Sequence, residues 1–455
     1  MIGYRPTDRR GREESDGAEA PRSGRQRAQW SSEAGFVFSM AAAAVGLGNL
    51  WRFPYMVGEN GGGAFILAYL CMLVVVALPI MMLEVGAGHL AHGSVVRTFG
   101  RLRHWGRPYG WFIVLLTVLI TSYYLVITGW TLGYSVAAVG FSLEPFDRFT
   151  SGFKSVWYFL AVIFLAMLVL IRGVTAIETV SKFLLPMLAA MVCGVAIFAQ
   201  TLDGQAEAWS FMFDVRWAEL SRPGLWVLAL GQAFYSLTIG QGYLITYGSY
   251  IPPTARVPRA SLVVAGSQVT ISLLAALMIF PFVFTFGHDP ASGSHLAFTV
   301  LPGVFADLAG GSWLAIAFFF MFFAAAFSSC LAGLKVVISA LSDELGLTDR
   351  HAVFLTCGLL ALLGLPSALS YSPVSLSVGG VPFLQFVDQV GGTNVVIASG
   401  AIGTALFCWF VPRARLASWL GLRDPRLARV MVALGRGLPL FIALLLTART
   451  LMAGG

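Results

Sequence analysis

The stretch from Ala41 to Pro54 reads AAAAVGLGNLWRFP and lies within an apolar run long enough to cross a bilayer, which takes about 20 residues. Its middle, Val45-Gly46-Leu47-Gly48-Asn49, is poor helix material, because a glycine costs about 1 kcal/mol relative to alanine inside a helix. A broken helix in a membrane also leaves backbone N–H and C=O groups that need polar partners. One glycine alone would indicate close helix packing. The asparagine, followed by Arg52 and Pro54, favours a ligand or ion site in the middle of the membrane.

Composition places the chain in a membrane. Of its 455 residues 57% are hydrophobic and 11% charged, whereas soluble proteins carry about 25% charged residues. The net charge of +7 does not indicate nucleic-acid binding, since the arginines cluster in short loops, the positive-inside pattern. The five cysteines fall in apolar segments and indicate packing rather than a disulfide framework or metal site. Residues 1–29 show no signal peptide and are interpreted as a disordered basic cytoplasmic tail.

The apolar runs predict an all-α integral membrane protein of about eleven transmembrane helices. The expected location is the cell (inner) membrane. With a cytoplasmic N-terminus and eleven spans, the C-terminus is expected on the external side. Segment 291–311 is too polar to span the membrane and is expected to form an external cap. The runs lie at 33–55, 64–88, 109–138, 154–171, 179–201, 224–250, 258–286, 312–341, 351–369, 380–411 and 430–451.

The sixth run repeats the interruption of the first, because polar residues and two glycines occur between Gln232 and Gly242. Spans 1 and 6 hold corresponding positions in two successive sets of five spans. Interruptions at matching positions predict inverted repeats with a binding site between them. The expected domains are a first repeat at 30–201, a second at 202–412, and a cytoplasmic loop with an eleventh helix at 413–455.

At these residues the sequence resembles the neurotransmitter:sodium symporter family, whose structural type is the bacterial leucine transporter. The resemblance covers about residues 27–412, and it implies a sodium-coupled importer of amino acids or their derivatives that performs no covalent catalysis. The motifs that carry it are AVGLGNLWRFPY (44–55), ENGGGAF (59–65), SYY and GWTLGY (within 122–134), GQAFYSLTIGQG (231–242), ITYGSY (245–250), AAFSSCLAGL (325–334) and SDEL (342–345).

The resemblance implies two sodium ions, held by oxygens that broken helices and hydroxyls supply. For one ion the implied ligands are the carbonyls of Ala42, Val45 and Ala325 with Ser328 and Ser329. For the other they are the Ala44 carbonyl, Asn49, Ser236 and Gln268, where the family usually has Asn or Asp in place of the glutamine. Without this context a serine pair in a membrane helix would indicate bonding to its own backbone.

The resemblance also assigns the substrate site. The carboxylate is expected at the N–H groups of Leu47 and Gly48 and the Tyr124 hydroxyl, and the ammonium at the carbonyls of Ala44, Tyr235 and Ser236 and the Thr238 hydroxyl. Gly46 favours an α-amino acid, because family members that carry amines without a carboxylate have Asp there. The side-chain pocket is expected to be lined by Ile120, Gln241, Ser329 and Gly333, which predicts a neutral amino acid of medium to large size, with aromatic side chains included.

Charged pairs match the family's gates. Arg52 and Asp388 match the external pair, with Tyr235 as a lid, and Arg27 and Asp343 match the internal pair, beside Trp30 and Tyr250. Glu84 is expected to brace the break in the sixth run, with snorkelling to the interface as the alternative. Lys335, seven residues after Ser328, departs from the family, and two roles stay open: a charge near the sodium exit, or a stem that reaches the cytosol.

A chloride ion is a further expectation. Span 7 (258–286) contains no Asp or Glu to balance two sodium ions, and four neutral donors resemble the chloride site of animal family members: Tyr69, Gln232, Ser236 and Ser272. Their alternative role is packing, satisfied by one another or by water.

Three other classes are weighed against a transporter. A channel would need a continuous polar lining and an enzyme a clustered nucleophile or metal set, and the sequence shows neither. A non-transporting amino-acid sensor on the same fold is the alternative that stays open. The expected partners are the amino-acid substrate and the lipid bilayer, with no nucleic acid and no obligatory protein partner.

Overall fold

The computed structural model describes residues 29–103, 106–252, 255–291, 305, 310–412, 416 and 425–453. Arg27, the predicted tail before residue 29 and most of the predicted external cap at 291–311 lie outside these residues. The described part is almost entirely helical, and each of the eleven predicted apolar runs contains helix. The proposed boundaries between the two repeats and the tail stay predictions.

Seven helices are long and apolar enough to cross a membrane, or eight if the bent pair of the first run counts as one span, within the part of the chain that the structure describes. Two shorter apolar helices lie at Lys154–Leu170 and Val432–Leu444. The sixth run appears as two short pieces because its middle is not helical. The prediction of an all-α membrane protein is therefore confirmed.

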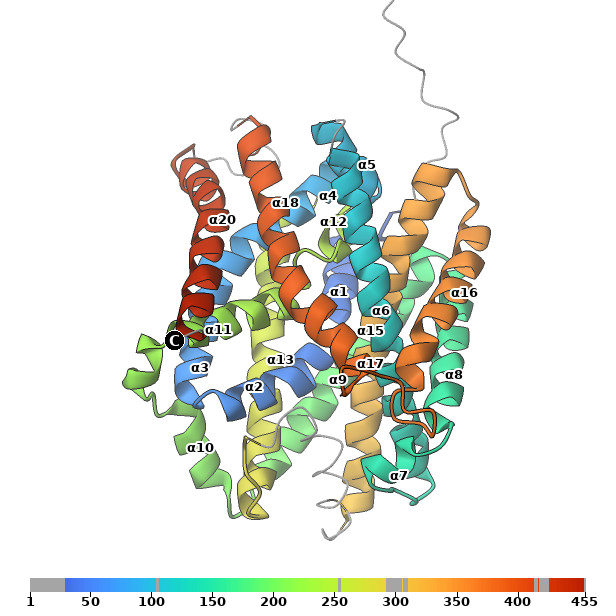
Figure 1. Ribbon diagram of the computed structural model, residues 1–455, viewed down its shortest axis with the longest axis vertical. Helices are drawn as coiled ribbons and strands as arrows, with labels where there is room; N and C mark the ends of the chain where they lie inside the picture. Colours follow the sequence, from blue (N-terminus) through green and yellow to red (C-terminus); the bar gives the residue numbers. More distant parts are fainter. Residues whose placement is uncertain are drawn as a thin grey trace, which may run out of the picture.

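The first half of the chain contains the first break, within the span formed by residues 33–59. Helix α6 packs along α15, and α1 lies against α9, α13 and α15, so the broken span is enclosed by other helices (Figure 1). The elements are α1 (Glu33–Ala44), η1 (Gly48–Arg52), α2 (Phe53–Glu59), α3 (Gly63–Met72), η2 (Leu73–Ala77), α4 (Leu78–Ala91), α5 (Val95–Leu102), α6 (Arg107–Val139), α7 (Phe146–Thr150), α8 (Lys154–Leu170) and α9 (Val174–Ala199).

The second half carries the second break and a short antiparallel hairpin in which Ser377 pairs with Pro382. In Figure 1, α5 lies at the opposite end of the molecule from α7 and α10, as expected for a chain that crosses repeatedly. The elements are α10 (Gln205–Phe213), η4 (Trp217–Ser221), α11 (Pro223–Ser236), α12 (Tyr243–Gly248), α13 (Val257–Thr285), α15 (Gly311–Leu345), α16 (Asp349–Ala368), β1 (Ser377–Val378), β2 (Val381–Pro382), α17 (Phe383–Val387), η7 (Asp388–Val395), α18 (Val396–Phe410) and α20 (Pro425–Ala453).

The first break falls where the glycines predict it. Ser32 caps α1 by accepting a hydrogen bond from the Gly35 N–H, and the helix ends at Ala44. The chain resumes as a π-helical turn at Gly48, and the two halves of the span are bent by 51°. All residues from Ala41 to Leu50 are buried, so the irregular backbone lies inside the protein, the only place where a membrane tolerates it.

The second break is built on left-handed backbone. Helix α11 ends at Ser236, and Thr238, Gly240 and Gly242 have φ angles of +54°, +74° and +77° before α12 begins. The glycines adopt this conformation without the cost that a side chain adds. At Gly240 a Cβ would also come within 2.6 Å of the Gly400 backbone nitrogen, so the break packs directly against α18.

Candidate functional site

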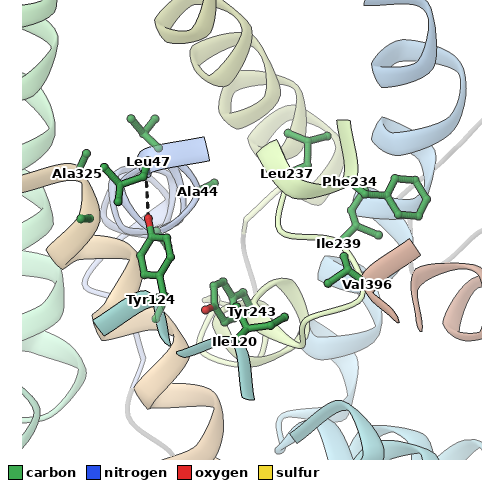
Figure 2. Close-up of a cluster of buried hydrophobic side chains, with 14 of the residues drawn as sticks. Ala44, Leu47, Ile120, Tyr124, Phe234, Leu237, Ile239, Tyr243, Ala325 and Val396 are labelled. Carbon is green, nitrogen blue, oxygen red and sulfur yellow. Dashed lines mark hydrogen bonds between the residues drawn. The ribbon is translucent and has the colours of Figure 1, made fainter. Parts of the chain in front are cut away.

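A small cavity of about 30 Å³ lies where the two breaks meet. Of the predicted substrate residues, eight line it, and they come from both breaks and from α6 and α15. Figure 2 shows Ala44, Ile120, Tyr124 and Tyr243 converging in this region. The lining residues are Ala44, Gly46, Gly48, Ile120, Tyr124, Tyr235, Thr238, Gln241, Tyr243 and Ser329.

One wall of the cavity presents the hydrogen-bond donors expected for a carboxylate. The Leu47 N–H leaves the helical pattern and donates to the Tyr124 hydroxyl at 3.0 Å, the dashed line in Figure 2. Gly46 lies against the same wall, because a Cβ there would be 2.5 Å from Ser329 Oγ and 2.7 Å from the Tyr124 hydroxyl. A residue larger than glycine at position 46 would therefore displace this wall.

The backbone polar groups of the second break are paired with side chains. The Gly240 N–H donates to Glu84 Oε1 at 3.0 Å, and the Gly240 carbonyl accepts from Ser399 Oγ at 2.7 Å. The Gln241 carbonyl accepts from Thr117 Oγ1 at 2.6 Å. Glu84 is 3% exposed, so it does not snorkel to the interface but braces the break from within the protein.

Three of the predicted substrate residues, Leu47, Ser236 and Gly333, are not among the residues that line the cavity. Gly333 does not line the cavity, because Thr121 and Tyr243 occupy the space beside it: a Cβ at 333 would be 2.5 Å from Thr121 Oγ1 and 2.6 Å from the Tyr243 hydroxyl. Ser236 also lies outside the lining. Tyr243 was missed, since an aromatic residue just after a break is indistinguishable in sequence from a core residue.

The residues implied for the first sodium ion cluster between α1 and α15. Ser328 Oγ donates to the Ala42 carbonyl at 2.7 Å and to the Ala325 carbonyl at 2.9 Å. Ser329 differs from its neighbour, because its hydroxyl donates to the Ala43 carbonyl at 2.8 Å and it lines the cavity. The structure thus brings three implied ligands together. Val45 is buried at the C-cap of α1, where its N–H donates to the Ala41 carbonyl at 2.7 Å.

The residues implied for the second sodium ion meet between the first break and α13. Asn49 donates through Nδ2 to Ser272 Oγ at 2.8 Å and to the Gln268 carbonyl at 3.4 Å. Gln268 donates through Nε2 to the Ala41 carbonyl at 3.2 Å. Within the described residues, the buried Oδ1 of Asn49 and Oε1 of Gln268 have no hydrogen-bond donor. Two uncharged oxygens are thus available here, which is the ligand chemistry a monovalent hard cation needs.

The four residues of the implied chloride site are fully buried and adjacent. Gln232 donates through Nε2 to Ser236 Oγ at 3.1 Å and to the Gly48 carbonyl at 2.9 Å. The Tyr69 hydroxyl lies near those of Ser236 and Ser272. This donor-rich set borders Asn49 through the hydrogen bond between Asn49 and Ser272.

On one side of the cavity, the predicted external gate residues are close together. The Arg52 guanidinium lies 4.6 Å from the centroid of the Tyr235 ring, which lines the cavity. Asp388 is near enough to attract Arg52 electrostatically, and its Oδ1 accepts from the Tyr123 hydroxyl at 2.7 Å. Tyr123 is therefore a further member of this group, which the sequence did not indicate.

On the other side, aromatic residues close the path along α1. Trp30 is buried, donating through Nε1 to the Tyr247 carbonyl at 3.1 Å and through its backbone N–H to the Tyr250 carbonyl at 2.9 Å. Asp343 accepts from the Ser94 N–H at 2.6 Å, at the N-cap residue of α5, while Arg27, its expected partner, lies outside the described residues. Lys335 is only 6% exposed, and its ammonium lies 5.4 Å from the centroid of the Tyr250 ring.

Comparison with known proteins identifies the family. The model of the sodium:neurotransmitter symporter family matches residues 27–153 and 150–418. An uncharacterised sodium-dependent transporter of Bacillus subtilis, YhdH, is 34% identical over 83% of this chain and 87% of its own length. An uncharacterised sodium-dependent transporter of Haemophilus influenzae is 30% identical over 85% and 90%, respectively.

The fold is likewise shared with a solved structure. The crystal structure of MhsT in complex with L-phenylalanine superposes with a TM-score of 0.86 at 31% identity, covering 92% of this chain and 99% of that one. The residues matched by the family model span both breaks and the site residues described above. The chain therefore belongs to the sodium:neurotransmitter symporter family, a family of sodium-coupled membrane transporters and not of enzymes.

Proposed function

We propose that this protein imports a neutral, medium-to-large α-amino acid together with sodium ions by alternating access. The observation that carries the proposal is the junction of the two breaks, where hydrogen-bond donors face one end of a buried cavity and uncharged oxygens lie beside it. A zwitterion needs donors for its carboxylate and acceptors for its ammonium, and broken helices supply both within a few ångströms.

The carboxylate would bind at the Leu47 and Gly48 N–H groups and the Tyr124 hydroxyl. The contact of 3.0 Å between Leu47 N and Tyr124 supports this role, because it brings two of the three donors to one point. The ammonium would bind at the Ala44, Tyr235 and Ser236 carbonyls and at Thr238 Oγ1. That hydroxyl is buried and has no hydrogen-bond partner in the described part of the chain.

The size and neutrality of the substrate follow from the cavity lining. None of the described side chains that line it is charged, and burying an unpaired charge there would be costly. Ile120, Tyr124 and Tyr243 present apolar surface that suits a branched or aromatic side chain. MhsT, which shares the fold, is seen with phenylalanine in its crystal structure, and this supports a substrate larger than alanine.

Two sodium ions would bind beside this cavity. One would take the Ala42, Val45 and Ala325 carbonyls and Ser328; Ser329, whose hydroxyl bonds to the Ala43 carbonyl instead, is assigned to the substrate cavity. The other would take the Ala44 carbonyl, Asn49, Ser236 and Gln268, with the substrate carboxylate completing it. The contacts of Ser328 with two of these carbonyls and the unpartnered Asn49 and Gln268 oxygens, within the described residues, support the assignment.

Uptake into proteoliposomes tests the proposal directly. With an inward sodium gradient, labelled leucine, phenylalanine or tyrosine should accumulate, and an equimolar choline gradient should abolish the accumulation. A competition panel should rank these three above glycine, alanine, lysine and glutamate. Sodium-dependent binding without accumulation would indicate a sensor, and preference for glycine or a charged amino acid would refute the substrate class.

We further propose that chloride binds at Tyr69, Gln232, Ser236 and Ser272. The two sodium charges and a zwitterion add net +2 to a low-dielectric site, so a nearby anion would be favourable. Replacing chloride with gluconate should slow uptake by the wild type, whereas Ser272→Glu should make uptake indifferent to chloride. Full wild-type activity in chloride-free buffer would refute this part of the proposal and leave sodium coupling untouched.

A further inference from the structure

Lys335 is a buried ammonium group inside the longest spanning helix, α15. It is 6% exposed, and its neighbours Leu334 and Val336 are fully buried. The chain contains only three lysines, Lys154, Lys182 and Lys335, and its other cationic residues are arginines. A charged side chain at this depth is costly, so its presence calls for a functional explanation.

The ammonium lies on the same helix face as the cluster proposed to hold the first sodium ion. Helix α15 runs without interruption from Gly311 to Leu345, and Lys335 follows Ser328 by seven residues. Seven residues turn the helix through almost two full turns and advance it by about 10 Å. The Cα atoms of Ser328 and Lys335 are thus about 10 Å apart along the axis, with Lys335 nearer to Tyr250.

Little in its surroundings offsets this charge. Nζ lies 5.4 Å from the centroid of the Tyr250 ring, which attracts it through a cation–π contact. Within the described residues no carboxylate lies within ion-pair distance of Lys335. Asp343, two turns further along α15, accepts a hydrogen bond from the Ser94 backbone.

The Tyr250 residue is itself held in place by contacts with Ser339 and Trp30. Its hydroxyl is 2.8 Å from Ser339 Oγ, its carbonyl accepts from the Trp30 N–H at 2.9 Å, and its ring meets the Trp30 ring edge-on at 6.0 Å. The ammonium therefore lies between the sodium cluster and the residues that must separate for the path along α1 to open.

We propose that Lys335 lowers the affinity of the Ser328 sodium site. The inference rests on the proposed function, since it requires an ion at Ser328. Two like charges about 10 Å apart at an effective dielectric constant near 20 repel enough to weaken binding by roughly tenfold.

Sodium alone is the probe that tests this inference, so the identity of the substrate does not matter. Purified protein in detergent is titrated with sodium chloride against choline chloride at constant ionic strength, and the half-saturation of thermal stabilisation is measured. Lys335→Met should lower the half-saturation concentration about tenfold, whereas Lys335→Arg should leave it near the wild-type value. Lys154→Met, which removes the same charge from an exposed position near Glu144, is the matched control and should have no effect.

The same titration in a Ser328→Ala background separates charge repulsion from a general packing effect. If Lys335 acts on the ion at Ser328, its neutralisation should change sodium affinity far less once that site is damaged. Unchanged affinity in Lys335→Met and in the second neutral variant, Lys335→Gln, would overturn the inference while leaving the proposed function standing. Absence of any sodium stabilisation in the wild type would overturn both.

Discussion

The adjacent residues Ser328 and Ser329 provide a matched pair for testing the site, because they differ in what their hydroxyls contact. Ser328 Oγ bonds to the Ala42 and Ala325 carbonyls at 2.7 and 2.9 Å, where the first sodium ion is proposed to bind. Ser329 Oγ bonds to the Ala43 carbonyl at 2.8 Å and lines the substrate cavity. Alanine at 328 should therefore damage sodium binding, and alanine at 329 substrate binding.

The size of the effect follows from the loss of one neutral oxygen around a charge. A contact with a charged group contributes about 1.5–3 kcal/mol, which corresponds to roughly a 10- to 150-fold change in a dissociation constant. Ser328→Ala should therefore raise the sodium half-saturation concentration by at least about tenfold, whereas Ser329→Ala should change it by less than about threefold.

Both variants are compared by sodium-dependent thermal stabilisation and by binding of labelled leucine or phenylalanine at saturating sodium. Ser329→Ala should weaken amino-acid binding while its sodium titration stays close to the wild type. Wild-type sodium dependence in Ser328→Ala, or an equal loss of sodium affinity in both variants, would refute the assignment of the ion to Ser328.

Three further predictions follow from single contacts. Gly46→Ala should fold but lose at least about 90% of amino-acid binding, because its Cβ would be 2.5 Å from Ser329 Oγ; binding at the wild-type level would contradict the close approach. Glu84→Ala should lower the stability of the protein by about 1–3 kcal/mol, because the buried Gly240 N–H loses its acceptor; an unchanged melting temperature would contradict the bracing role. Tyr124→Phe should weaken binding of amino acids more than binding of their decarboxylated amines, measured by competition, and equal losses would argue against a carboxylate at this hydroxyl.

The two breaks could be predicted from sequence because their signals are local. Gly46, Gly48 and Asn49 cannot continue a helix in a membrane without polar partners, and Gly240 and Gly242 mark the second break in the same way. In the structure, Gly240 and Gly242 both have left-handed backbone conformations. Glu84, a lone carboxylate in an apolar span, was correctly expected to pair with that break.

The contacts between helices that are distant in the sequence could not be predicted from it. Nothing in the sequence around Gly333 indicates that Tyr243 and Thr121 would fill the space that the glycine leaves, because that depends on how α12 and α6 meet α15. The direction of the Gln268 amide towards Ala41 is set in the same way by the packing of α13 against α1. Side-chain direction across such an interface is a property of the assembled bundle and leaves no periodic signal in the chain.

Coupling between sodium and substrate binding tests the central claim most directly, since the claim is that the two breaks build one shared site. The affinity of purified protein for labelled leucine or phenylalanine is measured as sodium replaces choline at constant ionic strength. Because the substrate carboxylate is proposed to complete the second sodium site at Asn49, affinity should rise by at least about tenfold with sodium, and Asn49→Ala should abolish most of that rise. Tight amino-acid binding that is equal with and without sodium would contradict the account.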